Sequence, residues 1–120
     1  MITFKTITDL SKLPRDDPAR AVILDLLHQF PRDPESQGYI VLIQPGDTDI
    51  DLPELKGTIA DLCFDGVAKQ DGYYLAVYLT SNEWALELAV PDADWLSADI
   101  RASLESQSEN WPSYMKDPPF

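Results

Sequence analysis

The sequence predicts an α+β protein: an antiparallel sheet of four to five strands with two main helices packed on one face of it. Residues 58–90 alternate in polarity around two turns, which is typical of a three-stranded meander. Amphipathic helices are indicated at about 18–30 and 93–105. The chain has 120 residues, of which 44% are hydrophobic, enough for one domain. We therefore expect a single domain over 1–105 and an irregular tail over 106–120.

The first thirty residues predict a strand, a helical turn and a helix. Alternation over 2–7 favours the strand, and one helical turn is expected before Pro14. Asp17 then supplies an N-cap and Pro18 a first-turn proline, whose missing N–H costs nothing there. The apolar residues that follow recur at helical spacing and end before a proline. They are Ile23, Leu26, Leu27 and Phe30.

The next segment predicts a buried strand followed by an acidic loop. The run over 39–44 is apolar and is bounded by turn residues, so we expect a strand buried on both faces or nearly so. Residues 46–51 resemble the start of a calcium-binding loop, with alternate carboxylates. However, Leu52 stands where such a loop needs glycine, and Thr58 where it needs a bidentate glutamate. We expect an acidic loop or a helix entry capped by Asp51, and a weak divalent-cation site is the alternative.

The two turns of the meander predict its register. Asp71 and Gly72 form a favoured two-residue turn, and a four-residue loop over 80–83 follows the second strand. The second turn places Leu79 opposite Trp84. In this register one face of all three strands is apolar, and we expect this face to form the core. We expect the helix over 93–105 to cover it, with Asp92 or Ser97 as the N-cap of that helix. The core residues are Leu62, Phe64, Leu75, Val77, Leu79, Trp84, Leu86, Leu88 and Val90.

The opposite face of the meander is the predicted binding site. In the same register it exposes carboxylates beside tyrosines and alanines. Such a surface suits a partner that carries Lys or Arg, because aromatic anchors and negative charge both attract cations. The alternative is a solvated sheet face whose tyrosines only favour strand formation. The predicted binding residues are Asp61, Asp65, Tyr74, Tyr78 and Glu87.

The charge excludes two classes of partner. Asp and Glu number 21 against 9 Lys and Arg, a net charge of -12. Nucleic acid and anionic membranes bind clustered Lys and Arg, so we expect neither as a partner. No apolar run is long enough to span a bilayer, and the first residues lack a signal-peptide pattern. With one cysteine and no intramolecular disulfide, we expect a cytoplasmic protein.

The residues that carry common chemistries do not form a recognisable set. Cys63 and His28 are the single cysteine and histidine, and their spacing does not bring them together. The five glycines are scattered, so no phosphate-binding loop is indicated. The acidic pairs lie at turns and helix starts, where aspartate is favoured as a cap. We expect no cofactor and no metal, and enzymatic activity stays open as the less favoured interpretation.

The sequence favours a non-catalytic acidic protein that docks a basic macromolecular partner, as immunity proteins, inhibitors and DNA mimics do. One alternative is a small-ligand-binding or enzymatic domain with a cleft near Tyr74 and Tyr78. Another is a homodimeric structural or interaction module that pairs through the alanine-rich sheet face or an edge strand.

Overall fold

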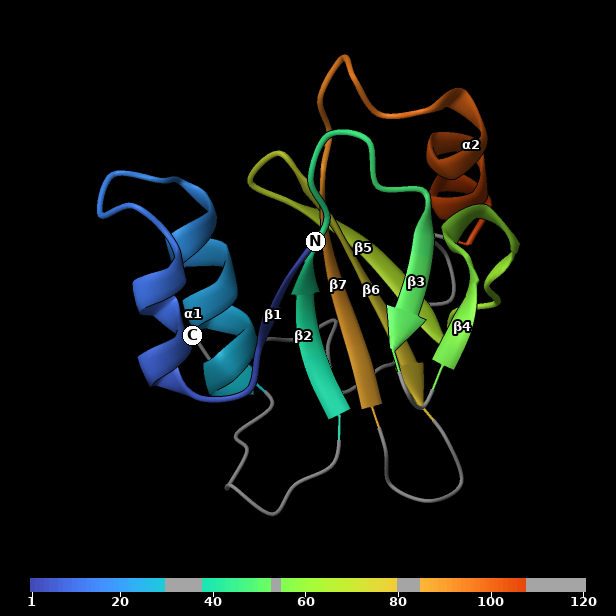
Figure 1. The fold of residues 1–120 in the computed structure, drawn as a ribbon. Helices are drawn as coiled ribbons and strands as arrows, with labels where there is room; N and C mark the ends of the chain where they lie inside the picture. The colour runs from blue at the N-terminus through green and yellow to red at the C-terminus, as the bar shows by residue number, and fades with distance from the viewer. Residues whose placement is uncertain (30–37, 53–54, 80–84, 108–120) are drawn as a thin grey trace.

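The fold is α+β, as the sequence predicts (Figure 1). The structure is a computed structural model that describes residues 1–29, 38–52, 55–79 and 85–107. These residues form a five-stranded, mostly antiparallel sheet, a separate two-stranded sheet and two main helices. The elements are β1 (Ile2–Phe4), the 3₁₀ helix η1 (Ile7–Lys12), α1 (Ala19–Gln29), β2 (Gly38–Leu42), β3 (Asp49–Leu52), β4 (Leu55–Thr58), the 3₁₀ helix η2 (Ile59–Asp61), β5 (Gly66–Gln70), β6 (Tyr73–Leu79), β7 (Ala85–Pro91) and α2 (Ala98–Ser106).

The five-stranded sheet has the order β1-β2-β7-β6-β5, with β7 in the middle. β5, β6 and β7 form the predicted antiparallel meander. β2 pairs with β7 in the parallel sense, which the sequence did not predict. Parallel neighbours need a long connection, and here everything between residues 42 and 85 separates the two strands. The acidic segment expected as a loop is partly a strand, because residues 49–52 form β3 and pair with β4.

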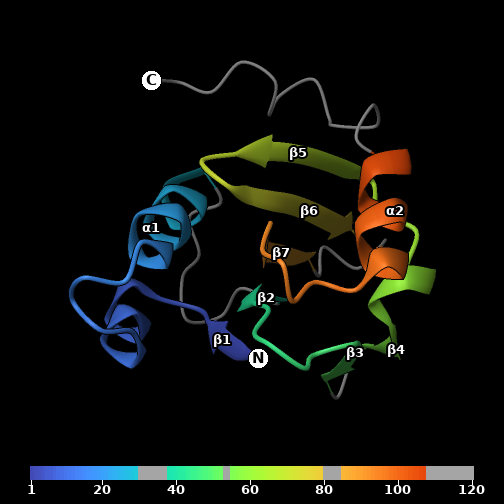
Figure 2. The same ribbon diagram turned by 90° about the horizontal axis from the view of Figure 1, so that it is seen from above.

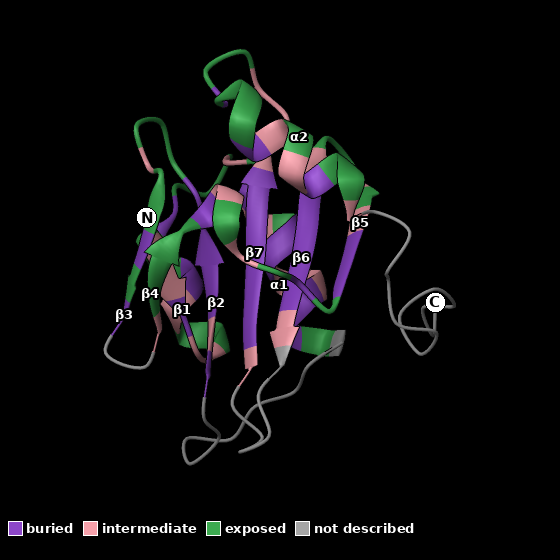
Figure 3. Ribbon diagram, turned by 90° about the vertical axis from the view of Figure 1, so that its right-hand side faces the viewer, coloured by how far each residue is buried: buried purple, intermediate pink, exposed green. Residues whose placement is uncertain are grey.

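Both faces of the sheet are covered, so the prediction of two helices on one face is wrong (Figure 2). α1 and η1 pack on one face, against side chains such as Ile40, Leu75 and Val77. α2, η2 and the β3–β4 pair pack on the other, against side chains such as Val41, Ala76 and Leu88. β7 is buried along most of its length as a result (Figure 3).

Local capping explains where the two helices begin. The Asp17 carboxylate accepts a hydrogen bond from the backbone N–H of Ala19 at 2.9 Å, as an N-cap should. The Ser97 hydroxyl accepts one from the N–H of Ile100 at 3.2 Å. Ser97 rather than Asp92 is therefore the cap of α2, and the helix starts five residues later than the predicted 93 because residues 92–97 form a loop.

The register of the meander is confirmed at its first turn and wrong at its second. Gln70 pairs with Tyr73, and Asp71 and Gly72 both have positive φ values, 53° and 83°. Leu79, however, pairs with Ala85 instead of Trp84. This shift of one residue exchanges the faces of β7 relative to β6. Trp84, the predicted loop over 80–83 and the tail beyond residue 107 lie outside the described residues.

The turn at Gly72 gives a test of the meander. Changing Gly72 to Ala should destabilise the protein by about 1–2 kcal/mol, because an L side chain is strained at positive φ. Crowding adds nothing, since a Cβ at Gly72 would meet no atom within 4 Å. Urea unfolding measures the effect, with Gly57→Ala as the matched control. A Cβ at Gly57 meets only Leu62, at an ordinary 3.8 Å. Equal stabilities of the two variants would contradict the turn.

Candidate functional site

The predicted binding face is not a solvent-exposed patch. Tyr74 is 2% exposed and, with the partly buried Tyr78, belongs to the core beside α2. Glu87 is 1% exposed and lies on the other face, where its pairing partners Val77 and Ile40 pack against α1. The shift in the β6–β7 register separates Glu87 from the tyrosines. The expectation of one outward surface of tyrosines and acids was therefore wrong.

The two predicted aspartates are exposed but are separated from the buried tyrosine and glutamate. Asp61 lies in η2, where its carboxylate accepts a hydrogen bond from the Thr58 hydroxyl at 2.6 Å. Asp65 precedes β5, and its backbone N–H donates to the carbonyl of Val77 at 2.7 Å. That these two residues contact a partner stays a prediction.

A network of polar side chains fixes α2 against the sheet. Asp92 follows β7, and its carboxylate pairs with the Lys69 ammonium at 2.6 Å and with the Arg101 guanidinium of α2. Arg101 also donates to the carbonyl of Ala93 at 2.9 Å. Because one carboxylate joins a strand residue to a helix residue, the network positions the first half of α2.

Tyr74 makes a second link to the same helix. Its hydroxyl donates a hydrogen bond to the Glu105 carboxylate at 2.8 Å. The Lys69 ammonium also lies 5.1 Å from the centre of the Tyr74 ring, within the range of a cation–π contact. The tyrosine that the sequence assigned to a docking surface is thus a core residue that supports α2.

The charges of this network shift each other's ionisation. The Arg101 and Lys69 cations hold the pKa of Asp92 below its ordinary value of 3.8. Asp92 in turn raises the pKa of Lys69. Removal from water, and then the bond to Glu105, raise the pKa of Tyr74. All three side chains keep their neutral-pH forms, so the network suits a structural role better than proton transfer.

We use the name acidic corner for five exposed residues on neighbouring elements: Asp49 of β3, Asp61 of η2, Asp94 and Trp95 of the 92–97 loop, and Asp99 of α2. The loops over 43–48 and 92–97 lie side by side in Figure 1 and Figure 2, and η2 packs against α2. All four aspartates are exposed, and none has an ion-pair partner within the described ranges. By contrast, Asp47, Asp51 and Asp92 each pair with a cation.

Packing within the 92–97 loop explains why Trp95 faces outward. The N–H of Leu96 donates to the carbonyl of Ala93 at 3.0 Å, which closes a turn. Leu96 is 7% exposed and belongs to the core, whereas its neighbour Trp95 is 38% exposed. Burial of one side chain in a tight turn therefore turns the next one to solvent. Trp95 was not among the predicted binding residues, although its position between aspartates and just before a helix cap was a usable signal.

The chemistry-bearing residues do not converge in the described part of the chain. No group of three or more His, Cys, Asp or Glu side chains there is arranged to hold a metal ion. Cys63 is exposed between η2 and β5, and His28 is exposed on α1. Because η2 and α1 cover opposite faces of the sheet, the cysteine and the histidine do not form a pair.

Comparisons with known proteins give no information on the function of this site. No protein-family model, curated protein or solved structure matches this chain. None of the helices among the described residues combines the length and apolar character needed to cross a membrane.

The Asp92 network predicts a pH-dependent loss of stability. Since the folded state lowers the pKa of Asp92, its contribution is full above the ordinary value of 3.8 and is lost as pH falls through the lower folded value. Asp92→Asn should therefore be less stable than the unmodified protein at pH 7, and the difference should shrink below pH 3.8. Thermal unfolding across pH measures this. The control is Asp94→Asn, and a difference that stays constant with pH would refute the pairing.

The Tyr74 hydroxyl gives an independent test of how α2 is attached. Tyr74→Phe should cost about 1 kcal/mol, because it removes the hydrogen bond to Glu105 and keeps the ring. The matched control is Tyr73→Phe. Its half-buried hydroxyl has no hydrogen bond in the described structure, so the change should be nearly neutral. Denaturant unfolding compares the two, and an equal loss in both variants would show that the bond contributes nothing.

Proposed function

We propose that the protein is a non-catalytic acidic binding protein that docks a basic macromolecular partner through the acidic corner. The observation that carries the proposal is an exposed tryptophan in a loop whose neighbouring elements carry four exposed aspartates that lack ion pairs with described residues. The net charge of -12 extends the attraction beyond this surface. Such long-range attraction speeds association and disfavours wrong partners.

Trp95 supplies the contact energy that charge alone does not. Tryptophan is among the residues most enriched at the energetic centres of interfaces. Its ring also accepts a Lys or Arg side chain by a cation–π contact, and surrounding carboxylates strengthen that preference for cations. Among the described residues only Met1, Ile7 and Trp95 are large, hydrophobic and exposed. Trp95 alone of these three lies in the acidic corner.

Immunity proteins, inhibitors and DNA mimics are the classes that this combination fits. Each presents a rigid acidic surface to a basic site and acts by occupying it, with no chemistry of its own. In this protein the rigid support comes from Leu96 in the core and from the Asp92 network beneath α2. A preformed surface of this kind loses little conformational entropy on binding.

The alternatives depend on other parts of the sheet. A small-ligand cleft near Tyr74 and Tyr78 is less favoured, because Tyr74 is enclosed in the core. Dimerisation through the alanine-rich face is less favoured for the same reason, since Ala76 and Ala89 are 1% and 0% exposed. Pairing through an edge strand stays a prediction, and sedimentation at two protein concentrations tests it.

A cationic probe tests the docking surface directly. Hexa-arginine peptide added to the full chain should shift the amide NMR signals of residues 92–99 most, and salt at about 1 M should abolish the effect, because its screening length is only about 3 Å. A variant carrying Asp94→Asn, Trp95→Ala and Asp99→Asn should bind at least about tenfold more weakly. The control carries Asp16→Asn and Asp71→Asn, which remove the same charge from two exposed positions elsewhere.

The same variants identify the natural partner. When used as immobilised baits in extracts of the source cell, the unmodified protein and the control should retain one basic protein that elutes as salt rises. The acidic-corner variant should not retain it. Peptide shifts spread evenly over the surface, or equal binding by both variants, would overturn the proposal.

A further inference from the structure

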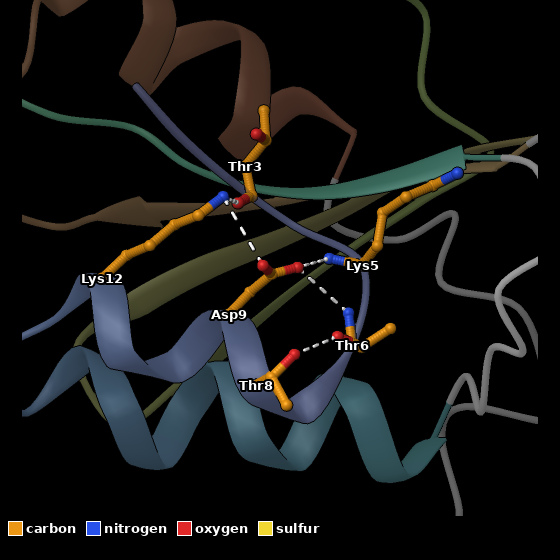
Figure 4. Close-up of polar contacts among 6 residues, drawn as sticks. All are labelled: Thr3, Lys5, Thr6, Thr8, Asp9 and Lys12. Atoms are coloured by element: carbon orange, nitrogen blue, oxygen red, sulfur yellow. Dashed lines mark hydrogen bonds and ion pairs between the residues drawn. The ribbon is translucent and has the colours of Figure 1, made fainter.

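An open groove lies between η1 and α1, on the part of the molecule away from the acidic corner. The two elements run beside each other in Figure 4 and pack together. The groove has a volume of about 600 Å³. Leu10 and Leu13 lie beneath it and are buried, while Leu24 forms part of its wall. Ile7 lines it and is 59% exposed, the most exposed large hydrophobic residue of the described chain.

Counted over the described residues, the lining also contains two arginines and no acidic residue. Arg20 extends from α1, and its guanidinium donates a hydrogen bond to the Leu13 carbonyl at 3.0 Å, which holds it at the groove. Arg15 is exposed in the loop between the two helical elements. It has no ion-pair or hydrogen-bond partner among residues 1–29, 38–52, 55–79 and 85–107. In a chain with 21 acidic residues, this lining is locally basic.

Two of the nearby carboxylates are engaged in hydrogen bonds of their own. Asp9 of η1 accepts hydrogen bonds from the backbone N–H groups of Lys5, at 2.7 Å, and Thr6, at 3.2 Å (Figure 4). The bond from Lys5 lowers the pKa of Asp9 more than any other contact, so the carboxylate stays charged and bound there. Asp17 is occupied as the cap of α1. None of Asp9, Asp16 and Asp17 is among the described residues that line the groove, so the charge of its lining comes from Arg15 and Arg20.

We propose that this groove binds an aliphatic carboxylate, with the carboxylate on Arg15 and Arg20 and the chain over Ile7, Leu10 and Leu24. Guanidinium groups bind carboxylates through charge-assisted hydrogen bonds. The volume lies within the range of small-molecule sites, about 300–1,000 Å³. The six residues of η1 extend about 12 Å at about 2 Å per residue, which suits a linear chain. The site is separate from the acidic corner and does not depend on the proposed function.

Titration of the full chain with sodium decanoate, followed by NMR, tests the proposal. We expect saturable shifts confined to residues 7–24, with acetate giving no saturation because it lacks the chain. Decylamine should bind at least about tenfold more weakly, because its ammonium meets two like charges. Shifts centred on Trp95 or spread over the surface, or equal affinity for decanoate and decylamine, would overturn the proposal.

Two exposed positions allow variants that leave the fold intact. Arg15→Gln should weaken decanoate binding on the order of tenfold, the value of a charge-assisted hydrogen bond. Ile7→Ser should weaken it less, about threefold, since only part of the side chain would be covered by the ligand. The control is Lys56→Gln, which removes the same charge from the exposed strand β4 on the other face of the sheet. Unchanged affinity in both groove variants, at unchanged melting temperature, would refute the site.

Discussion

The structure depends on the pairing of β7 between β2 and β6. Residues 86–90 are all buried, so every side chain of this stretch must fit a layer on one face or the other. Leu86, Leu88 and Val90 face α2 and η2, whereas Ala89 faces α1. A shift of one residue in β7 would exchange these sets and bring Glu87 to the other face. The arrangement of both helical layers therefore follows from this one register.

Coverage of both faces determines where binding surfaces remain. Residues 86–90 of the central strand are buried, and exposed groups that suit ligands lie in loops and between helices. The exposed Asp94 and Asp99 flank Trp95 in the sequence, whereas Arg15 and Arg20 line the groove on the α1 side. A basic partner and an anionic amphiphile would meet different parts of the molecule, so both bound states are compatible.

The sequence predicted most elements, because local signals define them. Asp17 with Pro18 marked the start of α1, and Asp71 with Gly72 marked the β5–β6 turn. The register predicted between β6 and β7 was wrong because it assumed that one face of the sheet is apolar and the other is exposed to water. With both faces buried, either alignment of β7 gives acceptable apolar contacts, and alternation no longer distinguishes them. The parallel β2–β7 pair carries no local signal either, since its strands are distant in sequence. The predicted binding site was wrong for the same reason, because only the predicted register puts Tyr74 and Glu87 on one face of the sheet.

Backbone NMR contacts between β6 and β7 test the register most directly. The N–H of Asp92 donates to the carbonyl of Gly72 at 2.9 Å, which makes 72 and 92 a hydrogen-bonded pair. The alternating pattern then makes Leu75 and Ala89 a non-hydrogen-bonded pair, with Cα atoms about 4.5 Å apart. A strong contact between the Hα atoms of Leu75 and Ala89 is the result the structure predicts. A strong contact between Leu75 and Leu88 in its place would contradict the register, the burial of Tyr74 and the position of the acidic corner.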